Sequence, residues 1–153
     1  MALQEPNPIR RLFFLQKPFK VIVSKTLGEL AKAIKPGVTT LQLDKIAEAC
    51  VRDHGAIPGF LGLYDFPNTL CMSPNSQVVH GIPNGNPLVE GDIISIDCGA
   101  LKNGFYGDSA YTFAVGEVTE DVLNLLRRTK ESLYLAIEQT VAGKRIGDIG
   151  YAV

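Results

Sequence analysis

The sequence lacks an excess of charge of either sign. It has 15 lysine and arginine residues against 16 aspartate and glutamate residues, which gives a formal net charge of −1. Proteins that bind nucleic acid or an acidic membrane usually present a basic face, and this balance gives no sign of one. We therefore expect neither a nucleic acid nor a membrane as a partner.

Cysteine is scarce in the chain. Cys50, Cys71 and Cys98 are odd in number and widely spaced. This spacing fits neither a zinc motif nor a framework of disulfides, and proteins without such a framework are typical of a reducing compartment. We expect a cytoplasmic location.

A long hydrophobic run is also absent. The first residues hold Pro6, Pro8 and Pro18 around a short apolar stretch. That stretch is too short and too interrupted for a secretory signal or a membrane span. We predict an atypical, proline-containing leader at residues 1–19. The remainder, 20–153, has the length of one domain, and 46% of the whole chain is hydrophobic, as is usual for globular proteins.

Hydrophobic spacing and capping residues predict four helices. The first spans 20–34, and the second begins at Thr39 or Thr40 and ends at Gly55. Thr119 caps a third helix at 120–141, and a fourth begins at 147–148. The apolar face expected for the second helix comprises Leu43, Ile46, Ala47 and Cys50. Between the helices we expect a long ordered loop at 57–74 and a short strand at 77–80.

The fourth predicted helix has barely begun when the sequence ends at Val153. An isolated helix needs on the order of 12–15 residues to be stable. We therefore expect a fragment or a truncated product. A faint repeat supports this view, because the helix, turn and cap at 34–46 recur weakly at 141–151.

The most informative feature is a predicted hairpin with an aspartate on each strand. Asn103–Gly104 is a strong two-residue turn signal. Pairing outward from this turn sets Asp97 opposite Ala110 and Gly99 opposite Asp108. Because side chains alternate between faces, Asp97 and Asp108 then share one face as diagonal neighbours. Two like charges held together in an apolar hairpin are costly unless a cation lies between them, so this pair predicts a metal site.

A plainer interpretation stays open at this point. Many hairpins carry exposed acids, and a shift of one residue in register would place the two aspartates on opposite faces. The strands flanking the turn are too apolar to face solvent throughout, which favours the metal site. Their apolar residues are Ile93, Ile94, Ile96, Cys98, Phe105, Tyr111 and Phe113.

Several segments, taken in order over about 21–153, resemble the type I methionine aminopeptidases. These segments are Lys35–Thr40, Asn68–Cys71, Val79–Pro83, Leu88–Asp97, Gly104–Ser109 and Gly147–Gly150. The resemblance implies an α+β protein with the pita-bread fold, in which two similar halves of helices and antiparallel strands enclose two metal ions. Residues 20–153 would be the N-terminal portion of that domain, an antiparallel sheet with helices on one face.

The resemblance also implies roles for individual residues. Asp97 and Asp108 would be metal ligands, with Co, Mn, Fe or Zn as the divalent ions and two ions in an intact site. His80 would be catalytic and would hydrogen-bond the substrate near the scissile bond. The pocket for the methionine side chain would be shaped by Phe60, Phe66 and Cys71. The substrate would be the N-terminal methionine of a peptide or nascent chain.

The family's other metal ligands, a histidine and two glutamates, come from the second half of the fold, and the acid–base glutamate is missing with them. We therefore expect little or no activity from this truncated chain alone, and either self-association or a complementing second half. Two alternatives stay open: a non-catalytic module of this fold that binds peptides or proteins, and a non-functional gene fragment.

Overall fold

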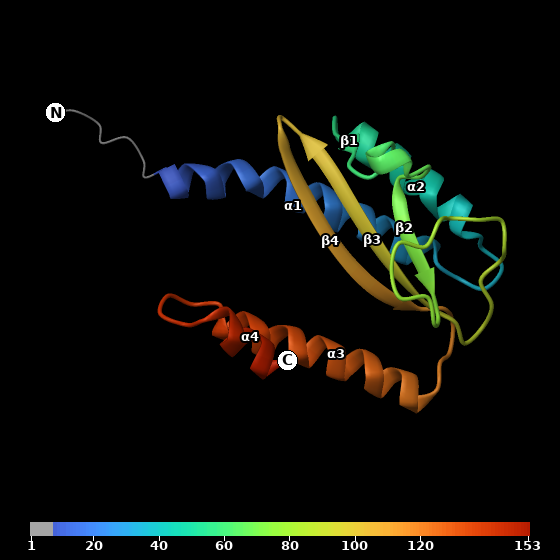
Figure 1. Cartoon of the computed structure of the whole chain (residues 1–153). Coiled ribbons are helices and arrows are strands. Elements are labelled where there is room, and N and C mark those ends of the chain that lie inside the picture. The colour runs from blue at the N-terminus through green and yellow to red at the C-terminus, as the bar shows by residue number, and fades with distance from the viewer. Residues whose placement is uncertain (1–7) are drawn as a thin grey trace. The chain divides into compact units, whose positions relative to one another are not determined.

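The computed structural model describes the backbone of residues 8–153 and the side chains of residues 21–153. It divides into two compact units, one that ends at Glu117 and one that spans Val118–Val153. Figure 1 shows the helices and strands of each unit. We describe the two units separately.

Helix α1 spans Pro8–Ala33 and thus begins inside the segment predicted to be a leader. Residues 1–7 lie outside the described part of the chain, and the predicted boundary at residue 19 stays a prediction. The helix ends just before Lys35–Gly37, as the sequence predicted. Gly37 has φ +89°, a left-handed conformation that glycine adopts without steric cost.

Helix α2 spans Thr40–Asp53 and begins with a complete capping box. The Gln42 amide donates to the Thr39 hydroxyl oxygen at 3.2 Å, and the Thr39 amide donates to the Gln42 side chain at 2.9 Å. Two backbone donors that the helix cannot pair are thereby satisfied. The buried face is centred on Leu43, Ala47 and Val51. Two residues expected on this face lie at its margin: Ile46 is exposed and Cys50 is half-buried.

Four antiparallel strands form one sheet around β3. The strands are β1 (Ile57–Pro58), β2 (Leu70–Pro74), β3 (Ile93–Lys102) and β4 (Phe105–Ala114). Strands β1 and β2 pair with successive parts of β3, and β4 pairs along its whole length. A short 3₁₀ helix, η1 (Leu63–Asp65), lies between β1 and β2.

Two sequence predictions for this region were wrong. The segment 57–74 contains strand β2 as well as loop, and 77–80 is not a strand. Strand β2 is buried on both faces, and its residues Leu70, Cys71 and Met72 are accordingly all apolar. The sequence therefore lacks the alternation of polar and apolar residues that marks a strand. Val78 and Val79 are instead 84% and 66% exposed, so their β-branched side chains pack against no sheet.

Helices α1 and α2 cover one face of the sheet, as predicted. Ile94, Ile96 and Cys98 of β3 are fully buried and share one apolar cluster with residues of both helices, among them Leu30 and Leu43. Side chains at odd-numbered positions of β3 point to the opposite face. That second face therefore carries Asp97 and Gly99 and is free to form a site.

The second unit consists of α3 (Glu120–Gln139) and α4 (Ile146–Ala152). Thr119 caps α3 as predicted, although the helix ends two residues before Val141. The turn that follows repeats features of the turn between α1 and α2. Gly143 has φ +92°, and the Arg145 amide donates to the Asp148 carboxylate at 2.8 Å. The faint repeat in the sequence therefore has a counterpart in the backbone. Within the described residues, no helix has the length and apolar composition that a membrane crossing requires.

Candidate metal and peptide site

The β3–β4 hairpin has the predicted register. Lys102 pairs with Phe105 around Asn103–Gly104, whose φ values of +51° and +81° are both positive, as type I′ turns require. Asp97 therefore lies opposite Ala110, and Gly99 lies opposite Asp108. The two carboxylates are diagonal neighbours on the face of the sheet that α1 and α2 leave uncovered. This part of the prediction from sequence is confirmed.

The Asp97 carboxylate is only partly compensated by its surroundings. Its Oδ1 atom is buried and accepts no hydrogen bond. Burial raises the pKa of Asp97 to about 6, and the charge of Asp108 adds to the increase, while the nearby His80 imidazole acts in the opposite direction. A buried acceptor without a partner, next to a second carboxylate, is an arrangement that a divalent cation would satisfy. The residues present therefore fit the metal that the resemblance implies.

Cys71, on β2, lies beside Asp97, on β3. The two residues are register partners across β2 and β3, and Cys71 is 6% exposed. Burial raises the pKa of the Cys71 thiol to about 11, with smaller contributions from Asp97 and Asp108. The thiol is therefore protonated at neutral pH. In this protonated form Cys71 presents a small, polarisable surface next to the carboxylates.

His80 is positioned by a loop that folds back on β2. His80 has φ +57°. The next residue, Gly81, makes hydrogen bonds to β2 through both its carbonyl and its amide. The Met72 amide donates to the Gly81 carbonyl at 2.8 Å, and the Gly81 amide donates to the Ser73 hydroxyl at 3.2 Å. A Cβ at position 81 would overlap the Met72 carbonyl oxygen, so only glycine allows this approach. His80 thus reaches the site from a loop, although the sequence predicted a strand.

Phe60 lies against β3 where that strand has no side chain. The Gly59 amide donates to the Gly99 carbonyl at 2.8 Å, which continues the pairing of β1. A Cβ at position 99 would lie 2.6 Å from Cε1 of the Phe60 ring, closer than such atoms approach. Gly99 therefore opens the space that the ring fills, in the same row of the sheet as Asp108.

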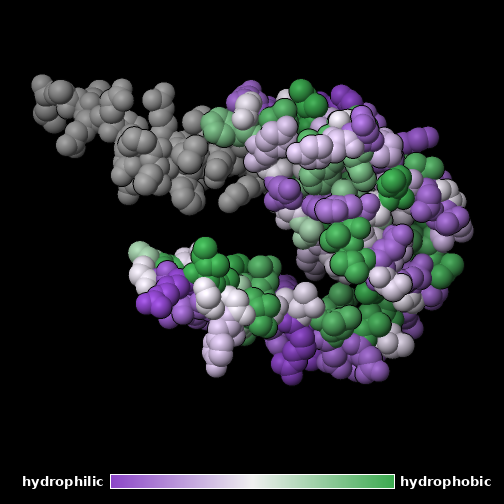
Figure 2. Space-filling model, in the orientation of Figure 1, coloured by the Kyte–Doolittle hydropathy of each residue, from purple (hydrophilic) through white to green (hydrophobic). Residues whose placement is uncertain are grey.

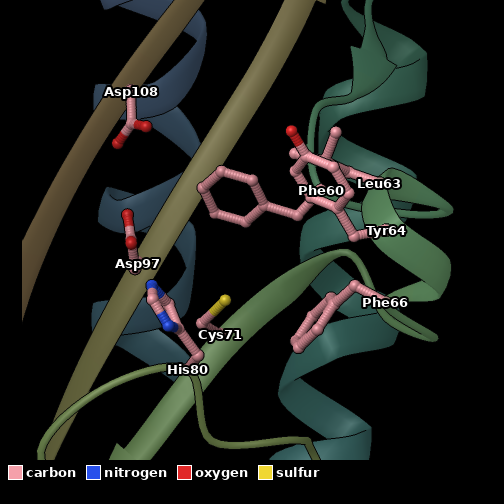
Figure 3. A pocket seen from close by; sticks show the side chains of 8 residues that line it. All are labelled: Phe60, Leu63, Tyr64, Phe66, Cys71, His80, Asp97 and Asp108. Carbon is pink, nitrogen blue, oxygen red and sulfur yellow. The ribbon is translucent and has the colours of Figure 1, made fainter.

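These residues surround one pocket of about 420 Å³ (Figure 3). Figure 3 shows Phe60 and Phe66 across the pocket from Asp97 and Asp108, with Cys71 and His80 between them. All six residues singled out in the sequence line it, and so do Leu63 and Tyr64. The pocket therefore has one apolar wall and one acidic wall.

Three residues of this region were missed from the sequence. Leu63 and Tyr64 lie in a loop whose left-handed backbone at Tyr64 no sequence pattern indicates. Asp44 was not singled out either, yet its buried carboxylate accepts from the Leu70 amide and from the Asn68 side chain, each at 2.9 Å. These bonds attach α2 to the start of β2, next to Cys71. An acid within the apolar stripe of a helix was the only available signal for Asp44.

Among the residues whose side chains the structure describes, no group of three or more histidines, cysteines, aspartates or glutamates could hold a metal ion.

Comparison with known proteins identifies the family. The model of metallopeptidase family M24 matches residues 20–153. A methionine aminopeptidase of Clostridium acetobutylicum is 48% identical over 133 residues, which are 86% of this chain and 53% of the relative. Methionine aminopeptidase 1 of Bacillus subtilis is 47% identical over 132 residues, again 86% of this chain and 53% of the relative.

A solved methionine aminopeptidase of Rickettsia prowazekii is 33% identical, with a TM-score of 0.90 over 98% of this chain and 60% of that protein. The predicted pita-bread fold is confirmed by this likeness. The chain spans about half the length of the curated relatives it matches. It belongs to metallopeptidase family M24.

Proposed function

We propose that this chain supplies two metal-binding carboxylates and the methionine pocket of an aminopeptidase that removes N-terminal methionine from peptides. The observation that carries the proposal is the pair Asp97 and Asp108, on one face of the hairpin, with a buried unpaired oxygen beside an apolar pocket. The relatives described above carry the name methionine aminopeptidase, which supports the same conclusion.

Asp97 and Asp108 would hold the divalent ions, for which Co, Mn, Fe and Zn all suit carboxylate ligands. When bound, such ions polarise a peptide carbonyl and make water a better nucleophile at neutral pH. Ions held by the two carboxylates would offset the negative charge of the acidic wall. A peptide N-terminus would therefore bind at this wall as the neutral amine, whose lone pair a divalent cation accepts.

The apolar wall binds the side chain. Phe60 and Phe66 offer aromatic surface to a thioether, and Cys71 offers a small, polarisable surface between them and the acids. His80 reaches the pocket from the loop that is bonded to β2, and its imidazole can hydrogen-bond the peptide group next to the first residue. The pocket would therefore distinguish a free N-terminal methionine by its amine at one side and its apolar side chain at the other.

We expect little turnover from the chain by itself. Two carboxylates are fewer donors than divalent transition metals take in catalytic sites. Further ligands and a general base for the nucleophilic water would have to come from another polypeptide segment, which is the partner we propose for this chain.

A binding experiment tests the proposed substrate. Methioninamide and N-acetylmethioninamide are titrated into the chain with Zn²⁺ present, and binding is followed by saturation-transfer NMR of the S-methyl signal. The free amine should bind at least tenfold more tightly than the acetylated form, because acetylation removes the amine lone pair that a cation held by Asp97 and Asp108 accepts.

The control is Asp121→Ala, which removes an exposed acid of the α3 unit and should leave binding unchanged. Asp97→Ala should abolish the preference for the free amine. Equal binding of both probes, with no effect of Asp97→Ala, would favour a peptide-binding module without a metal and contradict the proposal.

A further inference from the structure

Tyr64 is an exposed aromatic residue at the mouth of the pocket. Its side chain lines the pocket, yet it is 95% exposed. Cys71, which lines the same pocket, is 6% exposed. Tyr64 therefore lies at the outer end of the cavity, and its ring has a large apolar surface that a ligand leaving the pocket can cover.

The backbone holds this ring in place in an unfavourable conformation. Tyr64 has φ +50° and ψ +40°, and Asp65 has φ +64°. Left-handed backbone is uncommon for aromatic residues and persists only where surrounding structure imposes it. Here the Leu63 amide donates to the Phe60 carbonyl at 2.9 Å, and the Gly62 amide donates to the Phe66 carbonyl at 2.8 Å. The closed loop carries the ring outward instead of letting it pack on the sheet.

A peptide bound with its first residue in the inner pocket would extend along the open side of the cavity. With its amine at Asp97 and Asp108 and its first side chain against Phe60 and Phe66, the inner part of the cavity is filled. The second residue then lies toward the exposed end of the pocket, where Tyr64 is located. Leu63 and Tyr64, which line the pocket beside Phe60 (Figure 3), are 48% and 95% exposed and offer apolar surface there.

We propose that Tyr64 is a specificity-determining residue that contacts the second residue of a peptide substrate. The ring packs against the backbone and β-carbon of that residue and so binds peptides in preference to free methionine derivatives. This inference rests on the proposed function, because the first residue must occupy the inner pocket for the second to meet Tyr64.

Two probes that differ by one residue test the proposal, methioninamide and Met-Ala-amide, with Zn²⁺ present. Tyr64→Gly should weaken Met-Ala-amide binding about two- to fivefold and leave methioninamide binding unchanged, since only the longer probe reaches the ring. Tyr64→Phe should behave as the unchanged protein. Tyr64→Gly should not lower Tm, because glycine accepts a positive φ and an exposed ring contributes no core packing.

The matched control is Tyr151→Ala, since Tyr151 is also 95% exposed but lies in α4. It should change the binding of neither probe. Equal weakening of both probes by Tyr64→Gly, no weakening of either, or a fall of several degrees in Tm would overturn the role of Tyr64. If neither probe binds the unchanged protein, the proposed function itself fails, and the inference fails with it.

Discussion

At the scale of single residues, the structure places unfavourable groups where a ligand would relieve them. Asp97 is the main example, because burial and Asp108 raise its pKa from 3.8 to about 6. A carboxyl group with a raised pKa stabilises the fold while both states are protonated. That contribution is complete below about pH 3.8 and is lost as the pH rises through about 6.

Asp97→Asn should therefore stabilise the metal-free chain at pH 8 relative to the unchanged protein, and much less so near pH 4. Urea unfolding at the two pH values measures the difference. Asp121→Asn, an exposed acid in the first turn of α3, serves as the control and should not stabilise the chain at pH 8, because its charge interacts favourably with the helix N-terminus. If the stabilisation were the same at both pH values, the ionisation of Asp97 would not be what destabilises the fold at pH 8.

Gly99 supports a second prediction at this scale. Gly99→Ala should destabilise the chain by about 1–3 kcal/mol, because the added methyl group collides with the Phe60 ring. Gly28→Ala is the matched control, since nothing lies within 4 Å of a Cβ there. That change should stabilise α1 by about 0.5–1 kcal/mol.

Chemical denaturation measures both glycine variants. In a protein that already carries Phe60→Ala, the change Gly99→Ala should cost much less stability than it costs in the unchanged protein, because the ring it collides with is gone. Strict additivity of the two changes would show that the ring and the glycine do not share this space.

At the scale of elements, the β3–β4 hairpin could be predicted and β2 could not. Asn103–Gly104 specifies the turn, and the turn fixes which residues share a face, so Asp97 and Asp108 followed from the sequence. Strand β2 is buried on both faces, which removes the alternation that marks a strand. Tyr64 reaches its position through a left-handed backbone conformation, and nothing in the sequence predicts that conformation for a tyrosine.

The junction between α2 and β2 depends on Asp44. Asp44→Ala leaves the Leu70 amide and the Asn68 side chain without their acceptor, which should destabilise the chain by about 2–4 kcal/mol. Thermal or urea unfolding measures this loss. Asp53→Ala, an exposed acid on the last turn of the same helix, should change stability by less than about 0.5 kcal/mol. Similar losses for both variants would contradict a special role for Asp44.

At the scale of the whole molecule, each unit exposes hydrophobic side chains (Figure 2). Helix α3 has no fully buried residue, and its Leu125, Leu133 and Ile137 are 58%, 57% and 53% exposed. Exposed apolar surface of this kind promotes association. We expect the chain to self-associate at micromolar concentration in sedimentation velocity, and Leu133→Glu to weaken the association. A single monomeric species at all concentrations would contradict this expectation.

The central claim is that Asp97 and Asp108 form a cation site, and a calorimetric titration with Mn²⁺ tests it most directly. The unchanged chain, Asp97→Ala, Asp108→Ala and the control Asp121→Ala are compared under the same conditions. We predict binding to the unchanged chain and to the control that is lost in both hairpin variants. Equal binding by all four proteins, or no binding by the unchanged chain even at millimolar Mn²⁺, would contradict the claim that the hairpin holds a metal.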